Sequence, residues 1–423
     1  MSRDYIKWDK LDNTANLFPV IAGESLTNTY RISATLSEEI NPQLLQEAVD
    51  IVTPKFPGFD LRLRAGVFWY YFEENGKKPP RVFEENDFPC RFIHESRNNS
   101  YLFRVTYYKN RINLEVFHVL TDGMGGVNFL RELVYQYLRL AIPELKDLPN
   151  ELSAETSLNR EDSFVANYKK KAKSEYKRKK AFLIKDERLP YKGLGVIVGY
   201  MPVEQLKVAA KSYGCSINDY LVATFIYACY KTYVRFVSED KPIRVAVPVN
   251  LRPYFESNTT KNFFVMVSAE FYPKEEREYT FEEIAKDTHE CLKSQINKEN
   301  LEKIFSYNVS NEQVFIARAV PLFLKNIAIK LVYTMSALAN TTTVTNIGNI
   351  VFDEPYEKYV TGLNAYLSMS KGQELKATIS TFKGMLGLAY TSSWANTDVQ
   401  RRVFKQIAKD GVEVEIETNG VYK

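Results

Sequence analysis

The sequence is poor in histidine and cysteine. Of its 423 residues, three are histidine (His94, His118 and His289) and four are cysteine, none of them in a CxxC pair. So few histidines leave little choice of a general base and argue against a histidine-rich metal site. Scattered cysteines argue against a disulfide framework or a zinc site. We therefore expect no bound metal, and a reducing cytoplasm as the compartment.

Long hydrophobic runs are also missing. No stretch of 18 consecutive apolar residues occurs, so the sequence predicts no transmembrane helix. The tract that comes closest, residues 314–338, is interrupted by an arginine, a proline and two lysines. We expect its second part, Leu322 to Leu338, to form a core helix; the alternative is a wall of a lipophilic acyl or alcohol pocket. The first residues lack the apolar segment of a secretory signal, which agrees with a cytoplasmic protein.

Excess charge of one sign is absent overall but present locally. The net charge is 56 − 52 = +4, too small to indicate a nucleic-acid-binding protein. Between Tyr168 and Lys185, however, nine basic residues stand against one acid, a local charge of +8. This segment favours a domain boundary, with an N-terminal domain at 1–145, a basic crossover linker at 146–190 and a C-terminal domain at 191–423. It is either a solvated linker or a landing site for phosphates or anionic lipid.

Both halves combine strand-like and helix-like patterns. Apolar residues recur at helical spacing over Asn41–Val52 and over Gly125–Leu140, and Ser216 is placed to cap a long helix that runs to Val234. Alternating segments that predict strands lie between such helices, for example at Asn28–Leu36. The pattern predicts a mixed α/β protein built from two similar domains.

One motif carries chemistry. A predicted strand ends in His118, Asp122 and Gly123 follow four residues later, and two further glycines precede the helix. Glycines permit tight turns and close approach of the backbone. A neutral imidazole, whose ordinary pKa is near 6.5, can take a proton from a hydroxyl group. His118 is thus a candidate general base; the alternative is a core histidine beside an ordinary turn.

Three stretches in register make the chain resemble a known group. They are the HxxxDG motif at 118–123, the segment 247–253 with Arg252 (followed by Asn262 and Phe264), and Thr345-Asn346-Ile-Gly348. Together they resemble the chloramphenicol-acetyltransferase-like acyltransferase superfamily, nearest its alcohol acetyltransferase and condensation-domain-like branch. Condensation domains usually carry a second histidine where Phe117 stands here, and the DFGWG motif of the plant enzymes is absent.

The resemblance implies a fold and a site. It implies two chloramphenicol-acetyltransferase-like α/β domains with an active-site tunnel between them. His118 would be the general base, Asp122 would pair with Arg252 to hold the motif in shape, and Gly123 would leave room for the acyl chain or pantetheine arm. Thr345 and Asn346 are candidates for oxyanion or substrate contacts. The candidates for donor-phosphate contacts come from the basic segment: Lys169, Lys170, Lys171 and Lys173.

The implied reaction is acyl transfer from a thioester to an alcohol in a ternary complex. Coenzyme A would act as co-substrate rather than bound cofactor, and an acyl carrier protein is the alternative donor. The acceptor would be a small hydrophobic alcohol or lipid, with peripheral membrane contact as a further partner and no nucleic acid. Two other functions stay open: a catalytically silent protein that binds a hydrophobic ligand, and a condensation-type enzyme of lipid or natural-product assembly.

Overall fold

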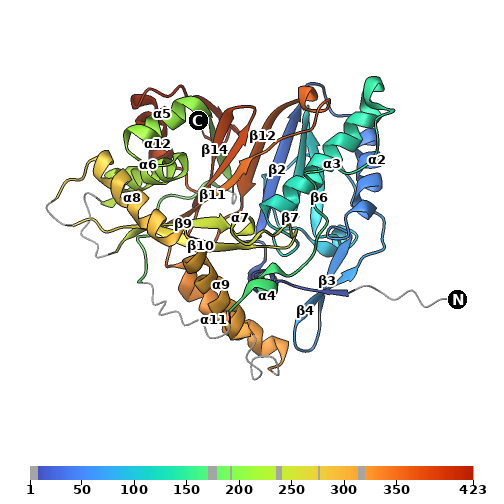
Figure 1. Ribbon diagram of the computed structural model, residues 1–423, viewed down its shortest axis with the longest axis horizontal. Helices are drawn as coiled ribbons and strands as arrows, with labels where there is room; N and C mark the ends of the chain where they lie inside the picture. The colour runs from blue at the N-terminus through green and yellow to red at the C-terminus, as the bar shows by residue number, and fades with distance from the viewer. Residues whose placement is uncertain are drawn as a thin grey trace.

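The computed structural model describes residues 8–169, 179–190, 193–234, 241–274, 277–312 and 320–422. Within these residues the strands form three sheets. Figure 1 shows two lobes whose larger sheets face each other, while most helices lie on the outer sides. The mixed α/β class and the two-lobed arrangement agree with the fold predicted from the sequence.

The first lobe is built on a five-stranded sheet in the order β12-β2-β7-β6-β5. Its pairs are antiparallel except β5 with β6. The strands are β2 (Thr29–Leu36), β5 (Phe83–Glu84), β6 (Phe103–Tyr108), β7 (Arg111–Phe117) and β12 (Val360–Leu367). Helices α2 (Pro42–Val52) and α3 (Gly123–Ala141) cover its outer face (Figure 1).

Local sequence explains where these helices begin. The Asn41 side chain accepts hydrogen bonds from the backbone N–H groups of Gln43 and Leu44. Pro42 occupies the first turn of α2, where a backbone N–H would have no partner within the helix, so its missing N–H costs nothing. Asp122 caps α3 in the same way. The apolar face of α2 is buried against the core of the lobe, as the helical spacing predicts.

The second lobe holds a seven-stranded sheet in the order β10-β9-β11-β13-β14-β8-β15, in which β11 runs parallel to β9 and β13. The strands are β8 (Gly195–Pro202), β9 (Ile243–Asn250), β10 (Phe264–Phe271), β11 (Thr342–Asn349), β13 (Leu375–Phe382), β14 (Met385–Ser392) and β15 (Glu415–Thr418). The covering helices are α5 (Val203–Ser212), α6 (Ile217–Thr232), α8 (Phe281–Gln295) and α12 (Asp398–Lys409).

Smaller elements complete the described chain. A three-stranded sheet contains β1 (Trp8–Lys10), β3 (Leu61–Ala65) and β4 (Tyr70–Glu74). The further helices are α1 (Phe18–Ile21), α4 (Ser163–Asn167), α7 (Arg252–Phe255), α9 (Lys298–Glu312) and α11 (Leu322–Ala337). Single 3-10 turns lie at Ala15–Leu17, Thr53–Lys55, Glu95–Arg97, Pro143–Leu145 and Glu357–Tyr359.

Strand β12 joins the two lobes. It follows β11 of the second lobe in sequence, yet it pairs with β2 of the first lobe along its length. Ile350, Phe352 and Tyr356, in the segment leading to it, belong to the first lobe's hydrophobic core. The division predicted from the sequence, with all of 191–423 in one domain, is therefore wrong for this segment. The change in composition along the sequence marks the basic linker, but it does not indicate that β12 returns to the sheet of the first lobe.

Helix α11 also departs from the prediction. Its two ends are buried at Leu322 and Ala337, but most of its apolar side chains face solvent. The expectation of a core helix is wrong, because the strands and helices around it leave one side of α11 uncovered. In the described part of the chain no helix is both long and apolar enough to cross a bilayer.

Candidate active site

The HxxxDG motif forms the connection between β7 and α3. Strand β7 ends at Phe117, and α3 begins at Gly123. Asp122 Oδ1 accepts hydrogen bonds from the backbone of Met124 at 3.2 Å and Gly125 at 3.4 Å. Because a helix N-terminus leaves backbone N–H groups unpaired and carries partial positive charge, this carboxylate stabilises the start of α3.

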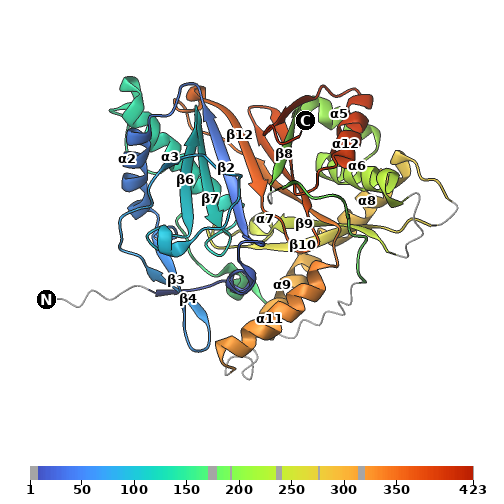
Figure 2. The same ribbon diagram turned by 180° about the vertical axis from the view of Figure 1, so that it is seen from behind.

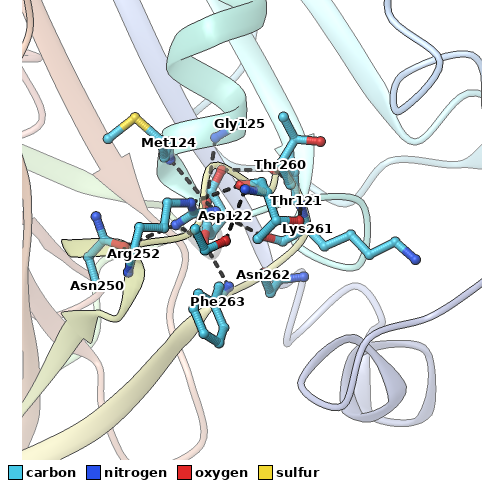
Figure 3. Close-up of polar contacts among 12 residues, drawn as sticks. Thr121, Asp122, Met124, Gly125, Asn250, Arg252, Thr260, Lys261, Asn262 and Phe263 are labelled. Atoms are coloured by element: carbon cyan, nitrogen blue, oxygen red, sulfur yellow. Dashed lines mark hydrogen bonds and ion pairs between the residues drawn. The ribbon is translucent and has the colours of Figure 1, made fainter. Parts of the chain in front are cut away.

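Asp122 also pairs with Arg252 of the second lobe, as Figure 3 shows. The guanidinium lies 2.9 Å from Asp122 Oδ2 and 3.1 Å from Oδ1, a two-pronged contact between side chains that are each 9% exposed. Arg252 further donates to the carbonyls of Thr259 and Lys261, and the backbone N–H of Phe263 donates to Asp122 Oδ2. The ion pair expected from the sequence is present, and it ties the motif to the loop before β10.

His118 lies where the lobes meet, in an aromatic surround. Its ring stacks on Phe18 of α1 with centroids 4.7 Å apart and meets Tyr30 of β2 edge-on at 5.1 Å. Phe264, the first residue of β10, lies 5.8 Å away. The residue is only partly buried, so the ring is confined by its neighbours but keeps some access to solvent.

Two residues that the sequence did not single out for a role hold the imidazole. His118 Nδ1 is 3.0 Å from Asn262 Oδ1, and Asn262 Nδ2 donates to Asp12 Oδ2 at 2.9 Å. The backbone N–H of Asn262 donates to the same Asp12 oxygen at 3.1 Å. Asn262 follows the segment 247–253 that carries the family resemblance, which gives it no role. Asp12 has no sequence signal at all.

This chain of bonds fixes the tautomer of His118. Asn262 Nδ2 faces acceptors, namely Asp12 and the His118 carbonyl, which determines that the amide oxygen faces the ring. A carbonyl oxygen can only accept, so Nδ1 carries the proton. In the neutral imidazole the free lone pair is then on Nε2, the atom that a general base needs.

Burial sets the charge state of the site. It lowers the pKa of His118 below its ordinary value near 6.5, with the carboxylate of Asp122 and the bond to Asn262 acting in the opposite direction. The ring is therefore mostly neutral at pH 7. Burial also raises the pKa of Asp12 to about 7, against the hydrogen bonds that it accepts from Asn262 and Ala15.

Gly123 and Gly125, at the start of α3, differ in how much room their surroundings leave for a side chain. A Cβ on Gly125 would overlap Thr121 Oγ1 and lie 2.9 Å from the carbonyl oxygen of Thr260. Only glycine lets the loop before β10 approach the helix so closely. At Gly123 a Cβ would meet Ile347 Cγ2 at 3.2 Å, which a small side-chain movement could relieve. Gly125 is thus needed for the packing of the lobes, and Gly123 much less so.

The remaining predicted residues are placed less directly. Thr345 and Asn346 lie on β11, and the neighbouring Ile347 approaches the start of α3. Asn346 is exposed and its Oδ1 accepts a bond from the backbone of Gly348 at 2.8 Å. No contact joins either residue to His118 in the described structure.

The basic segment is described in part. The Lys169 ammonium pairs with Glu302 at 2.6 Å although its side chain is 74% exposed, so an acid already offsets its charge. Lys170, Lys171 and Lys173 lie outside the described residues. Among the residues that are described, no group of three histidine, cysteine or acidic side chains could hold a metal ion.

Solved structures resemble this chain over nearly its whole length. F. graminearum TRI101, complexed with coenzyme A and deoxynivalenol, has a TM-score of 0.65 at 12% identity, covering 97% of this chain and 99% of that one. TRI3 trichothecene 15-O-acetyltransferase from Fusarium sporotrichioides gives 0.58 at 11%, covering 95% and 94%. Polyketide synthase associated protein 5 from Mycobacterium tuberculosis gives 0.61 at 13%, covering 94% and 97%.

The chain has the chloramphenicol-acetyltransferase-like fold. No protein-family model and no curated protein sequence matches it. The two lobes are joined by the Asp122–Arg252 pair, whose members are 130 residues apart in sequence, and by β12. At such low identity the resemblance describes the backbone arrangement alone.

Proposed function

We propose that this protein transfers an acyl group from a coenzyme A thioester to an alcohol, with His118 as the general base. The observation that carries the proposal is the geometry of His118: its ring is partly buried and bonded through Nδ1 to Asn262, which leaves the lone pair on Nε2. A base of lowered pKa stays unprotonated at neutral pH, and a hydroxyl group is a suitable proton source for it.

The acyl group passes directly from the thioester to the acceptor, with His118 carrying the proton. His118 Nε2 takes the proton of the acceptor hydroxyl while the hydroxyl oxygen attacks the thioester carbonyl carbon. The tetrahedral oxyanion then collapses, the carbon–sulfur bond breaks, and the imidazolium returns the proton to the thiolate. The products are an ester and free coenzyme A thiol. Thr345 and Asn346 on β11 remain our proposed oxyanion or substrate contacts, because Ile347 beside them approaches Gly123 at the start of α3.

Two similar proteins support the reaction class. TRI101 is described as complexed with coenzyme A, and TRI3 as an O-acetyltransferase. A carrier-protein thioester is the alternative donor, which the likeness to a polyketide synthase associated protein keeps open. The basic segment with Lys169, Lys170, Lys171 and Lys173 is our proposed contact for donor phosphate; neutralising these lysines should raise the donor KM at low ionic strength and leave kcat unchanged.

The test is direct. Purified protein is incubated with a panel of acyl-CoAs and alcohols, thiol release is followed, and the ester is identified by mass spectrometry. His118→Ala should lower the rate about 10²- to 10⁴-fold, as loss of a general base does. His94→Ala is the matched control, because His94 is an exposed histidine whose ring pairs with Glu24.

Each outcome separates the candidate functions. Thiol release without an alcohol would indicate hydrolysis rather than transfer. Acyl-pantetheine or a loaded carrier protein accepted in place of acyl-CoA would favour a condensation-type enzyme. Equal turnover by the wild type and His118→Ala would remove His118 from the mechanism. No turnover with any donor, together with tight binding of a hydrophobic compound, would favour the silent binding protein.

A further inference from the structure

Helix α11 presents a row of exposed apolar side chains. Those at four-residue intervals lie along one side of the helix, since residues i and i+4 are neighbours on its surface. The exposed fractions of six of them lie between 47% and 75%: Phe323, Leu324, Ile327, Leu331, Val332 and Met335. A helix that is apolar on nearly all sides is ordinarily buried in a core or in lipid, and this one is not covered by the described chain.

The tip of the β3–β4 hairpin extends this surface. Val67, Phe68 and Trp69 at the tip are exposed. The backbone N–H of Leu322 donates to the Val67 carbonyl at 2.8 Å, and the Lys325 ammonium donates to the Phe68 carbonyl at 2.8 Å. Figures 1 and 2 show the hairpin and α11 together at the lower edge of the molecule. We call the six residues of α11 and the three of the hairpin the apolar edge.

The polar groups of the apolar edge indicate its partner. Asn326 Nδ2 donates to the Tyr70 hydroxyl, and the Ser336 hydroxyl donates to the Tyr333 carbonyl. The Oδ1 of Asn326 has no partner among the described residues, but it is buried and offers no acceptor at the surface. Helix α11 contains two lysines, Lys325 and Lys330, and no acid. A protein interface usually offers directional hydrogen-bonding groups as well as apolar ones. The hydrocarbon of a lipid bilayer needs no hydrogen-bonding groups from the protein. Lysine and tryptophan are common at a bilayer surface, whose phosphates are anionic.

We propose that the apolar edge docks this protein on the surface of a phospholipid bilayer. With 16 residues α11 is about 24 Å long, short of the roughly 30 Å hydrocarbon core, so it would lie along the surface and not span it. Apolar patches this extensive are rare on monomeric soluble proteins that have no partner. The two lysines would add attraction to anionic lipid.

The position of the edge relates it to the candidate site. Helix α11 packs against α1, and Phe18 of α1 stacks on His118. If the proposed acyl transfer is right, a bilayer-dissolved alcohol would reach the base from the docked side. This consequence rests on the proposed function; the docking itself does not, and it can be measured without turnover.

Vesicle flotation tests the docking. Full-length protein is mixed with vesicles of phosphatidylcholine alone, or with added phosphatidylserine, and floated through a density gradient. We expect the wild type to float, more strongly with the anionic lipid. Leu331→Glu/Met335→Glu should weaken binding about tenfold or more, because both side chains lose their contact with the acyl boundary. Val208→Glu, at a 71% exposed valine on α5, is the matched control and should float like the wild type.

Light scattering and circular dichroism complete the test. Wild-type protein that fails to float would overturn the proposal, and a dimer that Leu331→Glu/Met335→Glu splits would assign the edge to a second copy of this chain. Loss of flotation in Val208→Glu as well would overturn it too, since binding would then not depend on the edge. With a water-soluble alcohol the double variant should turn over normally, so failed docking and failed acyl transfer are distinguishable.

Discussion

Helices α3 and α11 have opposite relations between composition and burial. Helix α3 is nearly all buried although it carries five charged or amide side chains: Asn128, Arg131, Glu132, Gln136 and Arg139. Helix α11 has two charged residues in 16 and is mostly exposed. The comparison shows that the place of a helix in the topology, and not its composition, determines how far it is buried. Helix α3 lies between its sheet and the returning segment before β12, whereas nothing in the described chain covers the outer side of α11.

Several of the buried polar side chains of α3 have hydrogen-bond partners. Arg131 donates to the Val351 carbonyl, and Arg139 donates to the hydroxyl of Tyr356, both in the segment that leads to β12. Glu132 accepts from the backbone of Ser153. Buried polar groups cost little when they are hydrogen-bonded. The returning segment therefore stabilises α3 through polar contacts as well as through the core.

The largest effect is expected at the N-terminus of α3. Asp122→Asn removes the counter-charge of the buried Arg252, and breaking such a pair typically costs about 3–5 kcal/mol. Urea unfolding should show this loss. Glu299→Gln, in the exposed pair with Lys303, is the control and should leave the unfolding midpoint nearly unchanged. A stable Asp122→Asn variant would mean that the pair contributes little to holding the lobes together.

The same substitution on the two helices sharpens the contrast. Leu133 on α3 is fully buried, and Leu331 on α11 is 63% exposed. Leu133→Ala should cost about 2–5 kcal/mol, the loss of a core leucine plus a cavity. Leu331→Ala should change the free energy of unfolding by less than about 0.5 kcal/mol. Equal losses in thermal or urea unfolding would show that α11 is covered in solution.

Alanine substitutions at Gly123 and Gly125 should differ in stability by a smaller amount. Gly125→Ala forces apart α3 and the loop that carries Thr260, at an expected cost of about 1–3 kcal/mol. Gly123→Ala meets only the flexible end of Ile347 and should be close to neutral for stability. Calorimetry of both variants measures the difference, and a Gly123→Ala variant as unstable as Gly125→Ala would contradict it.

The smallest expected effect is a shift in pH dependence. The base must be neutral, and burial lowers the pKa of His118 in the free protein, so the acid limb of kcat/KM should have its midpoint below about 6.5. The hydrogen bond that His118 Nδ1–H donates to Asn262 Oδ1 raises the pKa of His118. Asn262→Ala should therefore move the limb to still lower pH while kcat falls. A limb above 6.5 in the wild type, or one that Asn262→Ala moves upward, would be contrary to this assignment.

Much of the fold could be predicted because local signals were consistent. The helical spacing over Asn41–Val52, the cap at Ser216 and the alternation over Asn28–Leu36 each define an element by themselves. The Asp122–Arg252 pair came from a resemblance in motif order. Asp12 and the path of β12 could not be predicted, because a lone acid and a short apolar strand look the same wherever the topology places them. The exposure of α11 was missed for the same reason.

Strand β12 has a consequence for synthesis. Residues 360–367 complete the sheet of the first lobe, so during translation the edge of β2 lacks its partner until most of the chain has been made. An open strand edge invites pairing with other chains. We therefore expect a fragment that ends at residue 190 to aggregate when expressed alone, and co-expression of residues 191–423 to restore solubility. Soluble, monomeric 1–190 would show that the first lobe can fold before its last strand arrives.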